Sequence, residues 1–240
     1  MKAVFINEFG DVDKLNYSEV PDPIIKKNSI TVNIKASSIN HLDLWVRKGI
    51  ASDKSKLPII LGADGSGTIT SINSKNSIYK IGDDVIIQPG IFCGNCVYCK
   101  NSKENYCIEY GILGETHNGT QAELINVSTD NIYKKPYHLT FEEAASMPLV
   151  FMTAYQMIVG RARLKKDEII LIYGGSSGVG SAAIQISKDI GAYVIATAGS
   201  KEKCDYSLEM GANMVLNHNN SNWIIKIKEI SQGVDVIFEH

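Results

Sequence analysis

Residues 168–200 read EIILIYGGSSGVGSAAIQISKDIGAYVIATAGS. The stretch opens with an apolar, β-rich run at residues 168–173 and closes with another, YVIATA, at residues 193–198. The helical pattern between them places four residues on one face: Ala183, Ile186, Ser187 and Ile190. A strand, a glycine turn, a helix and a strand within about 30 residues form a βαβ unit, which predicts a parallel α/β sheet.

The glycine turn at residues 174–180 predicts a dinucleotide site. Glycine reaches φ > 0 and lets a phosphate approach without a Cβ, and the N–H groups of the following helix then face that anion. In the usual G-x-G-x-x-G pattern a glycine stands where this chain has Ser177. Because serine is small and can donate a hydrogen bond to phosphate, we expect the site to persist. The alternative is a purely structural βα turn. The predicted cofactor-binding residues here are Gly175, Ser176, Ser177, Gly178, Val179 and Gly180.

Four of the five cysteines crowd into one short segment: Cys93, Cys96, Cys99 and Cys107. Four thiolates at this spacing can surround one tetrahedral Zn²⁺, and they leave no open position for water or substrate. We therefore expect one structural zinc ion. Free cysteines and an iron–sulfur cluster are the alternatives. Cys204 stands alone and is expected to be a small packed residue.

Composition excludes several classes of protein. The formal net charge of −2 gives no electrostatic footprint for nucleic acid. No apolar run approaches the ~20 residues of a membrane span, and the N-terminus MKAVFINEF does not resemble a signal peptide. The sequence therefore predicts a cytoplasmic globular protein with a small-molecule substrate and with neither a nucleic-acid nor a membrane partner.

The first half of the chain alternates short strands with turns, which favours a small β-barrel or sandwich. A polar loop at residues 37–43 precedes a short helix at residues 42–48, and a glycine-rich loop follows at residues 62–67. Expected strands lie at residues 2–6, 15–20, 30–36, 68–72, 84–88, 124–127 and 132–134. A long apolar helix is expected at residues 148–159, and two helices and a strand at residues 201–210, 223–230 and 234–238.

Five motifs together resemble the medium-chain dehydrogenase/reductase superfamily of zinc alcohol dehydrogenases and quinone oxidoreductases. They are Asn40-His41-Leu42-Asp43, the loop at residues 62–67, the four-cysteine lobe at residues 93–107, GILGETHNGTQAE from Gly111, and the glycine turn. The resemblance implies a GroES-like β-barrel catalytic domain at residues 1–138 and a doubly wound Rossmann domain at residues 139–240. It also implies that this Rossmann part is incomplete at its C-terminus, and that the full-length protein forms a homodimer or homotetramer.

The resemblance also bears on the active site. In zinc-catalytic members, ligands stand at positions that this chain fills with Asn40, Ala63 and Leu149, which are poor zinc ligands. The chain therefore resembles the quinone and enoyl reductase branch, and hydride transfer to a conjugated carbonyl is expected without a catalytic zinc. Asn40 and His41 are the candidate donors to the developing negative charge, and Asp43 is expected to orient their loop. The alternatives are a site improvised by Asp64, His41 and Asp43, and an Asx-type turn with no chemical role.

Cofactor choice depends on the end of the second βαβ strand. Ala198 stands where NAD-preferring members carry Asp, whereas Ser200, Lys201 and Lys203 can meet a 2′-phosphate, so NADP(H) is favoured over NAD(H). The alternative for the two lysines is an exposed helix start with no role in binding. The resemblance places Thr153 near the nicotinamide. The sequence thus predicts an NADPH-dependent oxidoreductase. A zinc-dependent alcohol dehydrogenase and a non-catalytic NADPH-binding protein are the competing hypotheses.

Overall fold

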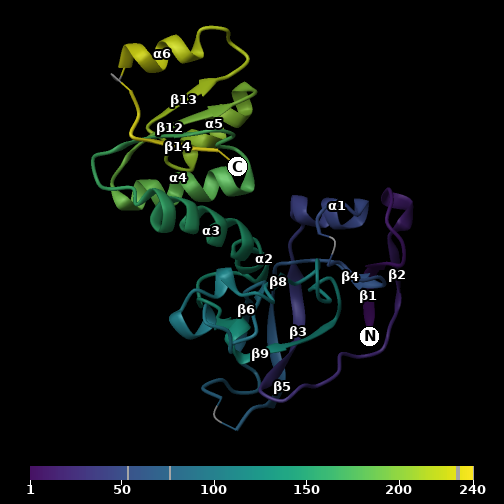
Figure 1. Ribbon diagram of the computed structural model, residues 1–240. Coiled ribbons are helices and arrows are strands. Elements are labelled where there is room, and N and C mark those ends of the chain that lie inside the picture. The colour runs from purple at the N-terminus through teal and green to yellow at the C-terminus, as the bar shows by residue number, and fades with distance from the viewer. Residues whose placement is uncertain (53, 76, 231–232, 240) are drawn as a thin grey trace. The chain divides into compact units, whose positions relative to one another are not determined.

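The computed structural model describes residues 1–52, 54–75, 77–230 and 233–239. It divides into two compact units, Met1–Leu149 and Val150–His240 (Figure 1). The helices and strands expected from the sequence are present. The structure adds short strands at Ile59–Ile60, Gly90–Ile91 and Gly111–Ile112 in the first unit and one strand, Met214–Asn217, in the second. No helix in the described part of the chain is both long and apolar enough to cross a bilayer.

The first unit is built on a five-stranded antiparallel sheet in the order β10-β6-β5-β3-β9. Alternating apolar residues of these strands form its core, which includes Ile30, Val32, Ile69 and Val85. The strands are β3 (Ser29–Ser37), β5 (Gly65–Asn73), β6 (Asp84–Ile87), β9 (Leu124–Ser128) and β10 (Ile132–Lys134).

Two smaller sheets complete the β structure of this unit. A three-stranded sheet has the order β2-β1-β4, and a two-stranded one pairs β7 with β8. Helix α1 (His41–Lys48) follows β3, and its Val46 packs with Ile6 and Ile59. The remaining strands are β1 (Lys2–Ile6), β2 (Asn16–Glu19), β4 (Ile59–Ile60), β7 (Gly90–Ile91) and β8 (Gly111–Ile112). Short 3-10 helices lie at Val12–Lys14, Cys99–Asn101, Glu104–Tyr106 and Thr129–Asn131.

The first unit extends beyond the division expected at residues 138/139. Helix α2 (Phe141–Ala145) packs on β3 and β5, and Ser66 Oγ donates a 2.6 Å hydrogen bond to the Phe141 carbonyl. Thr140 caps this helix by accepting a hydrogen bond from the Glu143 N–H, as a capping box does. Residues 139–149 therefore lie in the first compact unit of the structure, although the sequence assigned them to the second domain.

The second unit is a four-stranded parallel sheet in the order β13-β12-β11-β14. Its strands are β11 (Ile169–Ile172), β12 (Tyr193–Ala198), β13 (Met214–Asn217) and β14 (Val236–Phe238). Its helices are α3 (Pro148–Tyr155, which begins in the first unit), α4 (Gly178–Ile190), α5 (Lys201–Glu209) and α6 (Trp223–Ile230). A π-helical segment, Gln156–Ala162, continues α3.

Helices cover both faces of this sheet because alternate strand residues point to opposite sides. Ile170 and Ile172 pack with Ile184 of α4, whereas Leu171 packs with Ile227 of α6 on the other face. Strand β13 was missed from the sequence, where residues 201–238 were assigned two helices and one strand. Its four residues pair with β12 from Met214 opposite Ile195 to Asn217 opposite Ala198. The order β13-β12-β11-β14 confirms the doubly wound arrangement.

Candidate active site and metal centre

The polar loop before α1 is held by hydrogen bonds between its own residues and the loop at residues 62–64. Asn40 is the N-cap of α1, and its backbone N–H donates to Asp43 Oδ2 at 2.7 Å. Asp43 is buried, and its Oδ1 accepts from the Gly62 N–H at 2.9 Å. The structure therefore brings Asn40 and Asp43 together in a capping arrangement that fixes the start of the helix.

His41 is placed differently from its two neighbours. It is the first residue of α1, it is exposed, and its ring packs against Trp45 with 6.1 Å between ring centroids. Within the described residues, its ring nitrogens have no hydrogen-bond partner. Of the three predicted catalytic residues, His41 is thus the one whose side-chain polar atoms form no hydrogen bond to the described part of the chain.

The sequence named Asp64 only as a possible metal ligand, yet it is the centre of the hydrogen bonding in this region. The residue is fully buried. Its Oδ2 accepts from Asn40 Nδ2 at 2.9 Å and from Ser38 Oγ at 3.3 Å, and its Oδ1 accepts from the Leu149 N–H at 2.9 Å. Its backbone carbonyl accepts a hydrogen bond from Thr120 Oγ1 at 2.6 Å. Asp64 therefore connects three segments that are far apart in the sequence.

Burial governs the titration of both carboxyl groups in this region. Loss of solvent raises the pKa of Asp64 from its ordinary value of 3.8 to about 6, against the opposing effect of hydrogen bonds from Asn40, Leu149 and Ser38. Burial also raises the pKa of Asp43, although the N–H groups of Asn40 and Gly62 oppose the rise. Both groups have the environment in which functional carboxylates are often found.

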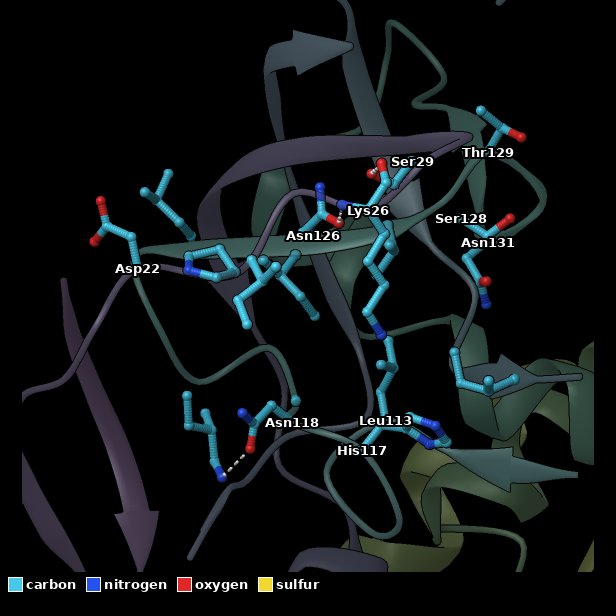
Figure 2. A pocket seen from close by; sticks show the side chains of 18 of the residues that line it. Asp22, Lys26, Ser29, Leu113, His117, Asn118, Asn126, Ser128, Thr129 and Asn131 are labelled. Carbon is cyan, nitrogen blue, oxygen red and sulfur yellow. Dashed lines mark hydrogen bonds between the residues drawn. The ribbon is translucent and has the colours of Figure 1, made fainter. Parts of the chain in front are cut away.

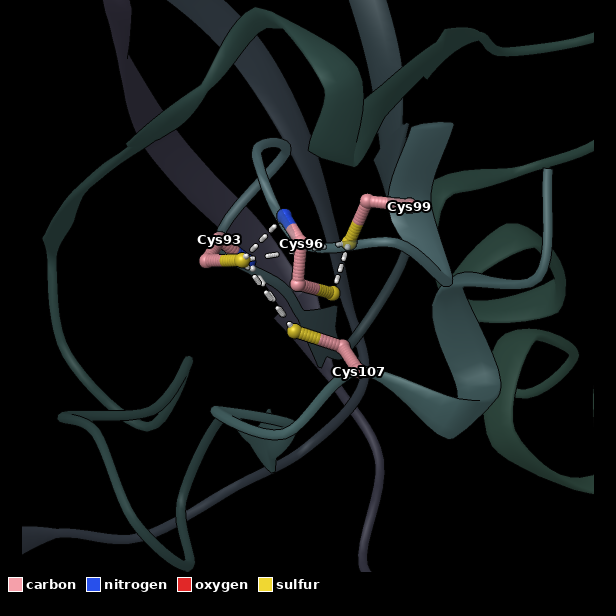
Figure 3. A group of neighbouring side chains, drawn as sticks. All are labelled: Cys93, Cys96, Cys99 and Cys107. Atoms are coloured by element: carbon pink, nitrogen blue, oxygen red, sulfur yellow. Dashed lines mark hydrogen bonds between the residues drawn. The ribbon is translucent and has the colours of Figure 1, made fainter. Parts of the chain in front are cut away.

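The four clustered cysteines converge on one point, as the sequence predicted (Figure 3). All four Sγ atoms lie within 4.8 Å of one another. The separations are 3.5 Å for Cys96–Cys99, 3.5 Å for Cys93–Cys107 and 4.0 Å for Cys93–Cys99. Zn–S bonds of about 2.3 Å in a tetrahedron require sulfur atoms roughly 3.8 Å apart. The four thiol groups therefore fit a tetrahedral metal ion, and no pair of them is bonded as a disulfide.

Backbone N–H groups point at these sulfur atoms. The N–H of Cys96 donates to Cys93 Sγ at 3.4 Å, and the N–H of Glu109 donates to Cys107 Sγ at 3.4 Å. The N–H of Cys99 lowers the pKa of Cys96 to about 6, whereas desolvation raises the pKa of Cys99 to about 12. N–H donors stabilise thiolates, the form in which cysteine binds metal.

In the second unit, the glycine turn leads into the N-terminus of α4. Ser177 caps this helix, since its Oγ accepts from the Gly180 N–H at 3.0 Å. Gly180 has no room for a side chain, because a Cβ there would lie 2.2 Å from the Gly174 carbonyl oxygen. Within the described residues, the N–H groups of Ser176, Gly178 and Val179 have no partner. The turn thus presents several N–H donors at a helix N-terminus, as an anion site requires.

The ends of β12 and β13 form the second part of this candidate nucleotide site. Ser200 caps α5 by accepting from the Lys203 N–H at 3.2 Å. Lys201 Nζ is paired with Asp205 at 2.7 Å, whereas the exposed Lys203 has no ion-pair partner within the described residues.

Sequence reasoning missed His218 at this edge. A Cβ at Gly199 would lie 3.0 Å from His218 Nε2, and Asn219 Nδ2 donates to the Gly199 carbonyl at 2.7 Å. The signal that could have found His218 is its place directly after an apolar run next to β12 in the sheet order. Thr153, the remaining predicted cofactor residue, lies on α3.

A cavity of about 1170 Å³ lies elsewhere in the first unit (Figure 2). It is bounded by the segment after β2 and by β9, and Lys26 extends across it toward His117 and Leu113. Burial and the charge of Lys26 lower the pKa of His117. None of the site residues predicted from the sequence lines this cavity.

Comparison with known proteins supplies the family. Residues 26–137 match the description "Alcohol dehydrogenase GroES-like domain", and residues 178–240 match "Zinc-binding dehydrogenase". The chain is 33% identical over 236 residues to an alcohol dehydrogenase of Geobacillus stearothermophilus, covering 98% of this chain and 68% of that protein. The chain belongs to the medium-chain dehydrogenase/reductase superfamily.

Other members of the superfamily agree with this assignment. The Homo sapiens quinone oxidoreductase is 31% identical over 242 residues, a match that covers all of this chain and 66% of that protein. A crystal structure titled as an NAD-dependent alcohol dehydrogenase superimposes with a TM-score of 0.95 at 40% identity, covering 99% of this chain and 70% of the other. The chain thus spans 66% of the length of the quinone oxidoreductases that it matches.

The superfamily includes enzymes with a catalytic zinc, for which the resemblance noted above places ligands at residues 40, 63 and 149. The side chains at the three ligand positions are those of Asn40, Ala63 and Leu149. Both oxygens of Asp64 accept hydrogen bonds from nearby donors. Within the described residues, the four cysteines are the only group of three or more His, Cys, Asp or Glu side chains whose ligand atoms converge.

Proposed function

We propose that this chain belongs to an NADPH-dependent reductase that transfers a hydride to a conjugated carbonyl, a quinone or an enone, without a catalytic zinc. One observation carries the proposal. The Asp64 carboxylate takes hydrogen bonds from Asn40 and Leu149, two of the residues at the zinc-ligand positions. Such an arrangement offers hydrogen-bond donors, rather than a Lewis acid, to a developing negative charge.

His41 is the donor best placed for this role. When bound, NADPH supplies the hydride that the reduction consumes. Negative charge then builds on the oxygen of the conjugated acceptor, and a neutral or protonated imidazole N–H can meet it. Asn40 and Asp43 hold the loop on which His41 stands, with Asn40 as a second candidate donor through its remaining Nδ2–H.

The second unit carries the proposed nucleotide site. The N–H groups of Ser176, Gly178 and Val179 would hold the pyrophosphate. Ser177 and Gly180 shape the turn through their own hydrogen bond. Lys203, assisted by Ser200 and His218, is proposed to bind the 2′-phosphate and so to favour NADP(H) over NAD(H). Thr153 is proposed to contact the nicotinamide end.

The cysteine cluster is proposed to bind one structural Zn²⁺. Four thiolates fill all positions of a tetrahedral ion, so the metal would stabilise the lobe at residues 93–107 and take no part in the reaction. A homodimer or homotetramer, and a location in the cytoplasm, complete the proposal.

The competing function is a zinc-dependent alcohol dehydrogenase. The 40% identical structure titled as an alcohol dehydrogenase favours it. The two functions differ in the number of metal ions and in substrate. A second zinc would need donors that Asn40, Ala63 and Leu149 do not supply.

The deciding experiment counts zinc per chain by mass spectrometry and follows NADPH oxidation with a small quinone, an enone and an aldehyde. One zinc with turnover of the quinone or the enone supports the proposal. Two zinc ions with turnover of the aldehyde would overturn it in favour of the alcohol dehydrogenase. One zinc with NADPH binding and no turnover would point to a binding protein instead.

A further inference from the structure

The start of helix α1 is tied to the loop at residues 62–64 by two buried carboxylates. Asp43 connects the helix to Gly62, and Asp64 connects Asn40 to the beginning of β5. Asn40 directly precedes His41 in the chain. The conformation of Asn40 therefore determines the position from which the His41 side chain extends. Asp64 also accepts a hydrogen bond from the Leu149 N–H.

A carboxylate can only accept hydrogen bonds, and this property fixes the Asn40 amide. With Asp64 Oδ2 at 2.9 Å, the Nδ2 group of Asn40 must face inward and its Oδ1 must face away. An amide at position 64 would remove this constraint, because it offers one acceptor and one donor group. The fixed orientation therefore depends on the charge state of Asp64 and not on the shape of its side chain.

Keeping such a group ionised in a buried place is unfavourable for folding, since burial disfavours the charged form. Three donors offset this only in part. A hydrogen-bonded amide of the same shape would avoid the loss. A buried charge that lowers stability is more readily explained by function than by folding.

We propose that Asp64 is a positioning residue, whose carboxylate orients Asn40 and thereby holds His41 where it can meet the substrate oxygen. The inference rests on the proposed function for its chemical consequence, but not for its structural one. Its structural consequence is that the environment of His41 changes when Asp64 loses its charge.

The test compares Asp64→Asn with Asp84→Asn, the same substitution at an exposed carboxylate of the same unit. The first readout is NMR of the histidine side chains. The chain has five histidines, and His41→Gln assigns the His41 signals by their loss. We expect these signals to shift in Asp64→Asn and to stay in place in Asp84→Asn. Unshifted His41 signals in Asp64→Asn would overturn the inference.

The second readout is steady-state kinetics with NADPH and the quinone or enone that the wild type turns over. Asp64→Asn should lower kcat by roughly 10- to 100-fold, because a misplaced donor loses much of its effect, and should change KM for NADPH by less than about twofold. Thermal unfolding at pH 7 should show no lower Tm than the wild type. An unchanged kcat in Asp64→Asn would show that Asp64 has no role in the reaction. A lower Tm together with a wild-type kcat would show that Asp64 is a purely structural residue.

A double variant in which residues 40 and 64 are exchanged distinguishes a positioning role of Asp64 from a loss of folding. In the double variant Asp64→Asn/Asn40→Asp, the introduced amide can donate to the introduced carboxylate while its oxygen accepts from the Leu149 N–H. We expect the His41 signals to return at least half-way to their wild-type positions. No return would contradict the proposed link through Asn40. If the wild type turns over neither substrate, the proposed function fails, while the NMR comparison still decides whether Asp64 positions His41.

Discussion

Ser177 Oγ accepts a 3.0 Å hydrogen bond from the Gly180 N–H and so caps helix α4 with the side chain that replaces the usual middle glycine. This bond uses a lone pair of the hydroxyl oxygen and not its proton, so the expected donation from Ser177 to a phosphate stays a prediction. The turn also presents a row of backbone N–H groups whose geometry depends on Gly180.

This arrangement predicts the effect of Gly180→Ala. A Cβ there would lie 2.2 Å from the Gly174 carbonyl oxygen, a backbone atom that can move only if the turn opens. We expect a loss of roughly 1–3 kcal/mol in the free energy of unfolding and at least a fivefold weaker binding of NADPH. Urea unfolding and fluorescence titration measure the two effects. The exposed Gln185 on the same helix gives the control, Gln185→Ala. Wild-type NADPH affinity in Gly180→Ala would show that the turn does not hold the cofactor.

Cofactor preference should depend on Lys203 and not on Lys201. Lys201 is engaged by Asp205 at 2.7 Å, while Lys203 is free for an anion within the described residues. Lys203→Ala should weaken NADPH binding by about 5- to 30-fold and leave NADH binding nearly unchanged, since only NADPH carries the 2′-phosphate. Lys201→Ala is the matched control, with an expected effect below about twofold. Parallel titrations with both nucleotides measure this, and an equal loss of both would refute the assignment.

Much of the fold could be predicted from local patterns, and its gaps have physical causes. The glycine turn, the period-2 strands and the cysteine spacing each encode a local structure, and all three are present. Strand β13 was missed because it is only four residues long, although Gly211 separates it from the preceding helix. The compact units divide after Leu149, eleven residues beyond the domain boundary expected at 138/139, because the packing of α2 on β3 and β5 is a tertiary contact.

The candidate active site was harder to predict than the fold. Asn40, His41 and Asp43 are adjacent in the sequence, so one motif pointed to all three. Asp64 gains its importance from Ser38, Asn40 and Leu149, which lie 26, 24 and 85 positions away along the chain. His218 likewise depends on the neighbouring ends of β12 and β13. The hydrogen bonds of Asp64 carry no signature in a single sequence, whereas the place of His218 after an apolar run is a weak one.

The cysteine lobe should depend on its metal. Cys96→Ser should reduce the zinc content from one ion per chain to less than about half and lower the Tm by several degrees, because a tetrahedral site loses one of four ligands. Cys204→Ser is the control, since Cys204 lies outside the cluster and is half-buried on α5. Zinc content by mass spectrometry and thermal unfolding test both variants. Full zinc occupancy with unchanged stability in Cys96→Ser would show that the cluster is not a structural zinc site.

The raised pKa of Asp64 makes a prediction about stability and pH whose sign follows from linkage. The folded state holds the proton up to about pH 6, whereas the unfolded chain releases it near 3.8. Between these values the folded state binds more protons, so this group's contribution to stability falls as the pH rises through the window and is constant above it. At about 1.4 kcal/mol for each pKa unit, the total fall is about 3 kcal/mol.

Asp64→Asn removes this titration, and the other carboxyl groups, including Asp43, remain in both proteins. The free energy of unfolding of the wild type minus that of the variant should therefore decrease between pH 4 and pH 6 and then level off. Urea unfolding of both proteins at intervals from pH 4 to pH 7.5 measures the difference, and Asp84→Asn, at an exposed carboxylate, serves as the reference. A difference that stays constant or rises across the window would mean that the three donors around Asp64 outweigh its burial, and that the group is ionised in the folded state without loss of stability.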